Sequence, residues 1–304
     1  MDMIVSFKAK RDLFNEYNVG RVIFLNEAGD EDIENAEILF TFRFEDEVSD
    51  ETFRKMKNLK IVQSLLAGVD YLPFEKLKGK VILKNSGALS WVIAEHVFAM
   101  ILSASRNIVL RTLHMRNGLF EQLEPGDTIG GKTMLIIGYG SIGREVAKIA
   151  KCFNMKILAI GRSGKCDECE KFGNLEKLHE FLPLADIIVI SIPLTKETKN
   201  LIGKRELELM KKNAIIVNVA RGKIIDQEAL YNHLLNKKEM KACLDVWWKY
   251  PRLNEKFKQD YPFEKLDNVI MTPHQAGIYK DYFDDMVRSG VRNILNYLKG
   301  NREN

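Results

Sequence analysis

The sequence predicts an α/β protein with two parallel-sheet domains, and three observations lead to this prediction. Short apolar runs alternate with helical patterns along most of the 304 residues, as expected for parallel strands joined by crossover helices. The alternation falls into two series, which a long apolar helical pattern separates. The second series begins with glycines spaced as GxGxxG, directly after an apolar run and before a helical pattern.

The first series occupies roughly the first 90 residues. Polar segments at residues 12–18, 31–35 and 50–56 have helical character, and Asp50 is a suitable N-cap for the last of them. The predicted strands are short and apolar, as buried strands are. They are residues 4–7, 21–25, 38–42, 61–65 and 81–84.

A single long helix is predicted at residues 90–117, which contain neither Gly nor Pro, and a polar loop follows at 118–131. The second series has six predicted strands, the number in a complete doubly wound nucleotide-binding sheet. They are residues 133–137, 156–160, 187–191, 214–219, 241–246 and 269–272. The predicted helices are residues 142–153, 175–181, 204–210, 227–236 and 280–299, and residues 247–262 are expected to form a long loop.

Composition excludes several classes of protein. The chain is 46% hydrophobic and 29% charged with a formal charge of +4, which is ordinary for a folded domain. No basic run indicates nucleic acid, no apolar run is long enough for a membrane span, and the N-terminus lacks the apolar core of a secretory signal. We therefore expect a soluble cytoplasmic protein. Cys166 and Cys169 form a CxxC without a second pair, which predicts a solvated loop rather than a zinc site.

The GxGxxG pattern consists of Gly138, Gly140 and Gly143, with Ser141 and Ile142 between the last two. Its position between a strand and a helix is what the dinucleotide-binding fingerprint requires. The first glycine permits the tight turn, the second lets the backbone approach the pyrophosphate, and the third lets helix and strand pack closely. The helix N-terminus then receives the negative charge.

The end of the second strand of such a unit indicates which nicotinamide dinucleotide is bound. An acidic residue there usually binds the adenosine ribose hydroxyls, but this chain has Gly161 followed by Arg162 and Ser163. A glycine beside an arginine accepts a 2′-phosphate that a carboxylate would repel. The sequence therefore favours NADP over NAD, although a solvated Arg162 in an indifferent site remains the alternative.

Three polar residues occur at or just after the ends of apolar strands, where ligands of parallel sheets bind. They are Arg221, Asp245 and His274. An arginine binds a carboxylate through two hydrogen bonds, and a histidine titrates near neutral pH. These properties suit hydride transfer to a 2-oxo acid.

The chain resembles the D-isomer-specific 2-hydroxyacid dehydrogenases, a family that includes glyoxylate and hydroxypyruvate reductases. Seven blocks in family order carry the resemblance, namely residues 63–70, 94–96, 131–143, 193–198, 218–222, 244–246 and 273–277. The resemblance implies a Rossmann domain, residues 93–276, inserted into a flavodoxin-like substrate domain formed by residues 1–92 and 277–304. It also implies a homodimer built on the helix near residues 90–117.

The resemblance also implies roles for individual residues. Arg221 matches the substrate-binding arginine, His274 the acid/base, and Asp245 the partner of the nicotinamide carboxamide, while His96 in the interdomain helix is read as structural. The turn of Leu66, Ala67, Gly68 and Val69 matches the cradle of the substrate carboxylate. The remaining expected cofactor contacts are Pro193, Thr198, Val219, Ala220 and Ala276.

One position departs from the family pattern. Where members carry the glutamate that holds the catalytic histidine, this chain has Tyr250. The resemblance to formate dehydrogenases, which have glutamine there, indicates that hydride transfer does not require this carboxylate. Glu255 and Asp260 from the same loop are candidate substitutes. Trp247 and Trp248 are either an apolar wall for the substrate or part of the core.

The sequence thus predicts NAD(P)H-dependent reduction of a small 2-oxo acid, of the glyoxylate or hydroxypyruvate type, to the D-2-hydroxy acid. A nucleotide-sensing regulatory protein on the same fold is the alternative, because fold alone does not determine activity. The presence of both Arg221 and His274 favours the enzyme.

Overall fold

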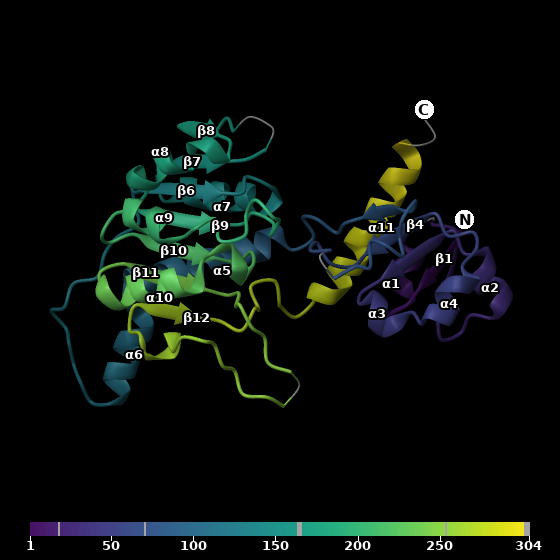
Figure 1. Cartoon of the computed structure of the whole chain (residues 1–304), viewed down its shortest axis with the longest axis horizontal. Helices are drawn as coiled ribbons and strands as arrows, with labels where there is room; N and C mark the ends of the chain where they lie inside the picture. The colour runs from purple at the N-terminus through teal and green to yellow at the C-terminus, as the bar shows by residue number, and fades with distance from the viewer. Residues whose placement is uncertain (18, 70, 163–165, 253, 301–304) are drawn as a thin grey trace. The chain divides into compact units, whose positions relative to one another are not determined.

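The structure is a computed structural model of the whole chain, and it describes all residues except 18, 70, 163–165, 253 and 301–304. It divides into two compact units (Figure 1). The terminal domain comprises Met1–Leu89 and Tyr279–Asn304, and the inserted domain comprises Ser90–Ile278. The predicted boundaries, after residues 92 and 276, lie within a few residues of these.

The terminal domain contains a five-stranded parallel sheet in the order β2-β1-β3-β4-β5. This is the strand order of flavodoxin-like sheets, as predicted. The strands are β1 Asp2–Val5, β2 Arg21–Phe24, β3 Ile38–Thr41, β4 Ile61–Ser64 and β5 Val81–Leu83. Successive residues of β1 enter different cores, with Met3 and Val5 in one and Ile4 in the other, so both faces of this sheet are buried.

Five helices cover this sheet: α1 Asp12–Asn15, α2 Asp30–Asn35, α3 Phe44–Glu47, α4 Asp50–Lys55 and α11 Tyr282–Gly300. The returning α11 buries Met286, Val287, Val291 and Ile294 in the same core as Met3 and Val5. The predicted cap of α4 is wrong by one residue. Ser49 is the N-cap, and its hydroxyl accepts a hydrogen bond from the Thr52 N–H (3.0 Å), which leaves Asp50 in the first turn.

The inserted domain contains a seven-stranded sheet in the order β12-β11-β10-β9-β6-β7-β8. The strands are β6 Thr133–Ile137, β7 Lys156–Ile160, β8 Lys171–Gly173, β9 Ile187–Ile190, β10 Ile215–Asn218, β11 Lys241–Leu244 and β12 Val269–Met271. The prediction of six strands missed β8. This strand is only three residues long, pairs with β7 alone at the sheet edge, and contains no apolar run that a sequence pattern would reveal.

Alternating residues of β6 assign the helices to two faces of this sheet. Met134 and Ile136 pack with α5 (Ser90–Ser105) and α7 (Ser141–Cys152), whereas Leu135 and Ile137 pack with α8 (Leu178–Phe181), α9 (Lys204–Leu209) and α10 (Gln227–Asn236). Helix α6 (Ile108–Arg116) follows α5. Short 3₁₀ turns lie at Leu175–Lys177, Leu182–Leu184, Gly222–Ile224 and Phe263–Lys265. The predicted fold class, two parallel-sheet α/β domains with one inserted in the other, is confirmed.

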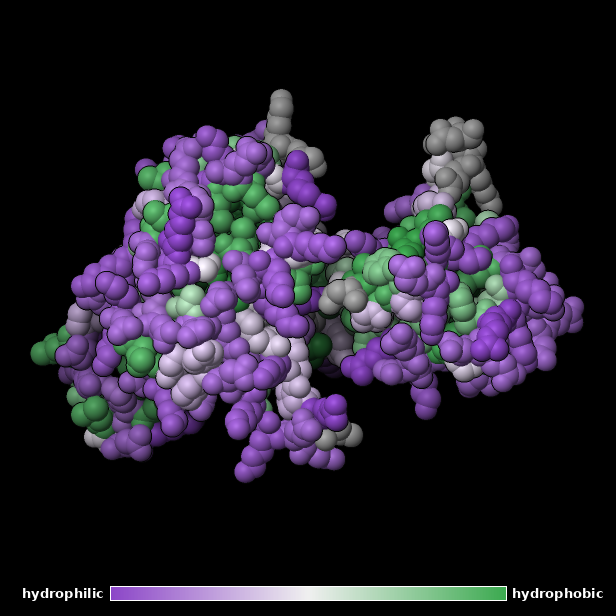
Figure 2. Space-filling view, viewed as in Figure 1, coloured by the Kyte–Doolittle hydropathy of each residue, from purple (hydrophilic) through white to green (hydrophobic). Residues whose placement is uncertain are grey.

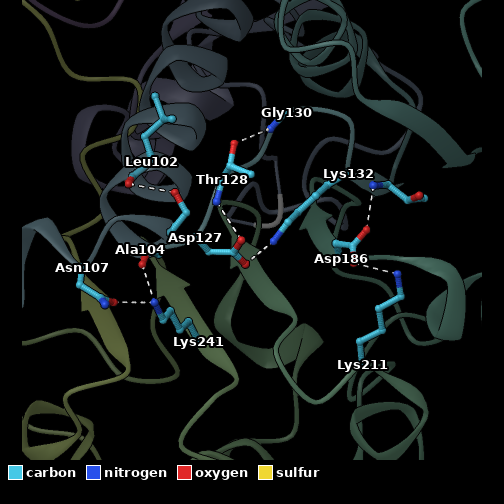
Figure 3. A network of polar contacts seen from close by, with 12 residues as sticks. Leu102, Ala104, Asn107, Asp127, Thr128, Gly130, Lys132, Asp186, Lys211 and Lys241 are labelled. Carbon is cyan, nitrogen blue, oxygen red and sulfur yellow. Dashed lines mark hydrogen bonds and ion pairs between the residues drawn. The ribbon is translucent and has the colours of Figure 1, made fainter. Parts of the chain in front are cut away.

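The single helix predicted at residues 90–117 is wrong, because the chain breaks between α5 and α6. Asn107 adopts a left-handed conformation with φ 53°. Lys241 extends from β11 and donates hydrogen bonds to Ala104 O (2.7 Å) and Asn107 Oδ1 (2.5 Å), as Figure 3 shows. The Asp127 N–H donates to Ser105 O (2.7 Å), so distant segments satisfy carbonyl groups at the end of α5. Such long-range capping is invisible to local periodicity.

Among the described residues, no single helix is long and apolar enough to cross a membrane. Helices α5 and α6 meet that criterion only when taken together, and they are bent by 59° at their junction. Most of the apolar side chains of α5 lie in the core of the inserted domain.

Cys166 and Cys169 form a disulfide in the loop between β7 and β8. Both residues are partly buried against the core shared by α5 and α7. The prediction of a solvated loop was therefore wrong for the two sulfur atoms, although Asp167 and Glu168 between them are exposed.

Candidate active site

The glycine-rich loop between β6 and α7 leaves no space for side chains at two of its glycines. Gly138 has φ 107°, and a Cβ there would lie 2.6 Å from the Ile192 nitrogen. A Cβ at Gly143 would lie 2.4 Å from Gly138 O, because the first turn of α7 approaches the end of β6. Ser191 secures the loop by donating a hydrogen bond to Gly138 O (2.9 Å).

At Gly140 the surroundings are different, since a Cβ there would have no heavy atom within 4 Å. Gly140 is the N-cap of α7, and its carbonyl accepts the first helical bond from the Arg144 N–H (3.0 Å). The N–H groups of Ser141, Ile142 and Gly143 precede that bond, so the helix supplies them with no acceptor. An open space in front of such donors fits a pyrophosphate.

The end of β7 is crowded at residue 161. A Cβ on Gly161 would lie 3.0 Å from the Phe172 ring and 3.5 Å from the Tyr139 Cβ, so a side chain there would require the phenyl ring to shift by a few tenths of an ångström. Arg162 follows and is exposed. Ser163, the other residue expected to bind a 2′-phosphate, lies outside the described residues.

The loop after β9 is held by Thr198, whose side chain is buried. Its hydroxyl donates to Pro193 O (2.7 Å) and accepts from the Thr195 N–H (2.7 Å). Thr198 therefore shapes the loop in this structure, and Pro193 supplies the carbonyl group that its hydroxyl binds.

Arg221 lies three residues beyond the end of β10, where a buried asparagine fixes the turn. The Asn218 side chain donates to Arg221 O (3.0 Å) and accepts from the Ala220 N–H (3.0 Å). The guanidinium donates to Ala220 O (2.8 Å) and is half-buried. A Cβ on Gly222 would lie 2.3 Å from the Trp247 carbonyl carbon, so this turn lies directly against the loop that follows β11. Val219 is buried beneath the turn.

Asp245 immediately follows β11, and its side chain is only 1% exposed. The carboxylate accepts hydrogen bonds from Thr272 Oγ1 (2.6 Å), the Gln275 N–H (2.9 Å) and the Ala276 N–H (3.0 Å). These bonds hold the turn after β12, in which His274 has φ 56°. A non-glycine residue rarely adopts this conformation, so Asp245 stabilises the backbone that presents His274.

His96 reaches this network from α5. Its Nε2 lies 3.2 Å from Thr272 Oγ1 and 3.7 Å from Asp245 Oδ1. The sequence marked His96 as structural but gave no partner for it. Thr272 and Asn218 were not identified from the sequence, since single polar residues in apolar strands carry no motif.

Tyr250 packs against His274, the residue beside which the resemblance places it. The ring centroids are 5.4 Å apart and the rings are tilted by 39°. The Tyr250 hydroxyl accepts a hydrogen bond from the Trp247 N–H (3.2 Å), and half of the tyrosine is exposed. The position of the family glutamate is thus filled by a neutral ring in contact with the imidazole.

The two candidate substitutes for that glutamate are engaged elsewhere in the loop. Glu255 accepts a hydrogen bond from the Arg252 N–H (3.0 Å), and Asp260 forms an ion pair with Lys249 (2.5 Å). Trp247 and Trp248 belong to the core, where their indole N–H groups donate to the carbonyl oxygens of Thr272 (3.0 Å) and Ile225 (2.7 Å).

These surroundings lower the pKa of His274 from its ordinary value. Loss of solvation is the largest cause, the Asp245 carboxylate opposes it, and the positive charge of Arg221 lowers the pKa further. The imidazole remains exposed at the surface of the inserted domain. It is therefore neutral over a wider range of pH than an isolated histidine.

The terminal domain contains the turn of Leu66, Ala67, Gly68 and Val69 after β4. Ser64 shapes its beginning, because the Ser64 hydroxyl accepts from the Leu66 N–H (2.9 Å) and lies 2.8 Å from the Tyr71 hydroxyl. Ala67 is exposed, whereas Val69 is buried beneath the turn.

The glycine loop, the charged residues at the strand ends and the doubly wound sheet define a dinucleotide-binding α/β protein. The family described as "D-isomer specific 2-hydroxyacid dehydrogenase, NAD binding domain" matches residues 98–276. The chain belongs to this family, whose members are oxidoreductases.

Known proteins resemble the chain over most of its length. The D-3-phosphoglycerate dehydrogenase of Methanocaldococcus jannaschii is 36% identical over 251 residues, which cover 81% of this chain and 47% of that protein. The glyoxylate reductase of Pyrococcus furiosus is 32% identical over 281 residues, which cover 89% of this chain and 82% of that protein. The chain therefore spans about half of the first relative and most of the second.

A solved structure extends the similarity to the fold. The D-lactate dehydrogenase of Aquifex aeolicus, complexed with NAD and lactic acid, has a TM-score of 0.74 and 26% sequence identity. The match covers all of this chain and 97% of the other.

The contact between Tyr250 and His274 generates a prediction about the imidazole. We expect Tyr250→Glu to raise the pKa of His274, because an ionised carboxylate beside the ring favours the imidazolium. An NMR titration of the histidine ring signals, with the His274 signal assigned through His274→Gln, measures the shift. Tyr250→Gln is the neutral control and should not raise the pKa comparably. Equal values in both variants would contradict the expected contact.

Proposed function

We propose that the protein is an NAD(P)H-dependent oxidoreductase that reduces a small 2-oxo acid, of the glyoxylate or hydroxypyruvate type, to the D-2-hydroxy acid. The observation that carries this proposal is the gathering of Arg221 and His274 at the same edge of the sheet that bears the glycine loop. Asn218 holds the turn that carries Arg221, and Asp245 holds the turn that carries His274. The glyoxylate reductase relative supports the substrate class.

The proposed dinucleotide site follows from the geometry of the inserted domain. The N–H groups of Ser141, Ile142 and Gly143 would bind the pyrophosphate, and Arg162 would bind the adenosine ribose end. Val219, Ala220 and Ala276 line the nicotinamide side. Asp245 acts as a positioning residue here, since its carboxylate already accepts three hydrogen bonds from the chain.

A nicotinamide dinucleotide held by these residues would supply the hydride for reduction of the carbonyl carbon. Arg221 binds the substrate carboxylate and the carbonyl oxygen, which stabilises the negative charge that develops on that oxygen. The His274 imidazolium donates its proton to the alkoxide. Reduction therefore requires the protonated ring, so activity falls as the pH rises through the pKa of His274. Because this pKa is lowered, we expect the fall at a lower pH than for a histidine held by a carboxylate.

A panel of 2-oxo acids, assayed with NADPH and NADH by the loss of nicotinamide absorbance, tests the activity. We expect turnover of small acids, and we expect Arg221→Lys to lower kcat/KM roughly ten- to a hundred-fold. A two-pronged charged contact is worth about 1.5–3 kcal/mol, and lysine cannot reproduce it. Arg205→Lys, on the exposed side of α9, is the control. No turnover of any acid would favour a nucleotide-sensing protein instead.

We propose NADP as the preferred cofactor, because residue 161 is a glycine without a carboxylate and Arg162 is exposed beside it. Arg162→Ala should lower the ratio of kcat/KM for NADPH to that for NADH by roughly ten-fold or more, since one charge-assisted contact is lost. Arg205→Ala should leave the ratio unchanged. A wild-type preference for NADH would contradict the assignment of this loop.

We further propose a homodimer formed through α6 and the loop that follows it. Large apolar side chains are exposed there, namely those of Ile108, Leu113, Met115, Leu119, Phe120 and Leu123. Figure 2 shows hydrophobic residues at the surface of this part of the inserted domain. Phe120 and Leu123 are 70% and 93% exposed, which is unusual for large apolar residues of a monomer.

Light scattering at micromolar concentration should give twice the mass of the chain. Phe120→Glu combined with Leu123→Glu should give the monomer mass, because two charges would be buried in the interface. Leu235→Glu, at an exposed apolar position of α10, should leave the dimer intact. A monomeric wild-type protein would refute the dimer.

A further inference from the structure

His96 extends from α5 toward the buried carboxylate of Asp245 without bonding to it directly. Its Nε2 lies 3.7 Å from Asp245 Oδ1, which is beyond hydrogen-bond distance, and 3.2 Å from the Thr272 hydroxyl oxygen. That hydroxyl oxygen lies 2.6 Å from the same carboxylate oxygen. Thr272 therefore stands between the imidazole and the carboxylate.

The distances determine the direction of both hydrogen bonds. A carboxylate has no proton to donate, so at 2.6 Å the Thr272 hydroxyl donates its single proton to Asp245. The Met100 sulfur, 3.8 Å from the same hydroxyl, is only a weak acceptor. The hydroxyl thus has no proton left for His96, and the contact between them is a hydrogen bond only if His96 Nε2 carries a proton and donates it. The result is a chain of two bonds that ends on the carboxylate.

The surrounding packing fixes both ends of this chain. Ala94 and Val97, on either side of the histidine in α5, are buried in the core of the inserted domain. The Thr272 N–H donates to Leu244 O on β11 (2.9 Å), and the Thr272 carbonyl accepts from the indole N–H of Trp247 (3.0 Å). The imidazole is only 19% exposed. Successive hydrogen bonds in such a place polarise and strengthen one another.

The far end of the chain is the carboxylate that holds the turn after β12. Asp245 Oδ1 also accepts from the Gln275 N–H (2.9 Å), and Oδ2 accepts from the Ala276 N–H (3.0 Å). His274 precedes these two residues and has φ 56°. Because that conformation is unfavourable for a residue with a side chain, the turn depends on its bonds to the carboxylate.

We infer that His96 is a positioning residue for the proposed reaction. Its Nε2–H donates to the Thr272 hydroxyl, which keeps the hydroxyl proton directed at Asp245, and Asp245 holds the turn that presents His274. His96 acts through these residues and not on the substrate. The inference rests on the proposed function, since it concerns the residue assigned there as the proton donor.

Hydrogen exchange of the Gln275 and Ala276 amides in the full chain measures how firmly the turn is held, in the absence of substrate and cofactor. His96→Leu has no donor, and we expect both amides to exchange about two- to ten-fold faster, the effect of one lost hydrogen bond. His96→Gln supplies an amide N–H in place of Nε2–H and should keep most of the protection.

Phe98→Leu is the matched control for a general loss of stability. Phe98 belongs to the same helix and is buried, and its ring stacks on Phe153 with the centroids 5.6 Å apart. The substitution removes buried atoms, so it should lower the melting temperature. It should not selectively increase exchange at the Gln275 and Ala276 amides, because it leaves the chain of hydrogen bonds intact.

Steady-state kinetics with a 2-oxo acid that the wild type reduces gives a second measurement. His96→Leu should lower kcat about two- to ten-fold and leave the Kd of the dinucleotide unchanged. Thr272→Val keeps the shape of the side chain but removes both bonds. His96→Leu combined with Thr272→Val should be no slower than Thr272→Val alone, since both substitutions break the same chain.

Three results would each overturn the inference: unchanged amide exchange in His96→Leu, no advantage of His96→Gln over His96→Leu, or losses of kcat that multiply in the double variant. Absence of turnover of every 2-oxo acid by the wild type would instead contradict the proposed function. Amide exchange requires no turnover, so the two failures are distinguishable.

Discussion

The active-site edge of the inserted domain depends on one buried carboxylate. Asp245 lies at the end of β11, has almost no exposed surface, and accepts three hydrogen bonds from the segment that follows β12. A buried charge is costly unless it is fully hydrogen-bonded, so these donors and the carboxylate stabilise one another. The turn they hold presents His274 in a backbone conformation that few non-glycine residues adopt. Replacement of this carboxylate would disturb the fold and the site together.

A second close approach brings the other functional groups to the same edge. The turn at Gly222 lies so close to Trp247 that no side chain fits between them. The loop after β11 then returns with Tyr250 beside His274. Arg221 and Tyr250 consequently belong to one packed assembly of loops, although they are almost thirty residues apart in sequence. At residue 250, where the resemblance predicts a glutamate, the chain has a tyrosine whose ring contacts the imidazole.

The adenosine side of the domain depends on backbone N–H donors, a positive charge and close packing rather than on a buried carboxylate. Backbone N–H groups at the start of α7 and the positive charge of Arg162 are available to phosphate groups, and the Phe172 ring crowds the position of Gly161. The same phenyl ring contacts Tyr139 and lies beside the disulfide-closed turn.

The sequence by itself determined the two parallel sheets, the glycine loop and the strand-end positions of Arg221, Asp245 and His274. These features follow from local periodicity and from the rule that ligands bind at the carboxyl ends of parallel strands. Only the tertiary structure decided the break between α5 and α6, the edge strand β8, the core positions of Trp247 and Trp248, and the hydrogen-bond partners of Asp245. Each of these depends on contacts between residues distant in sequence, such as Lys241 with Asn107, and a local pattern carries no record of such contacts.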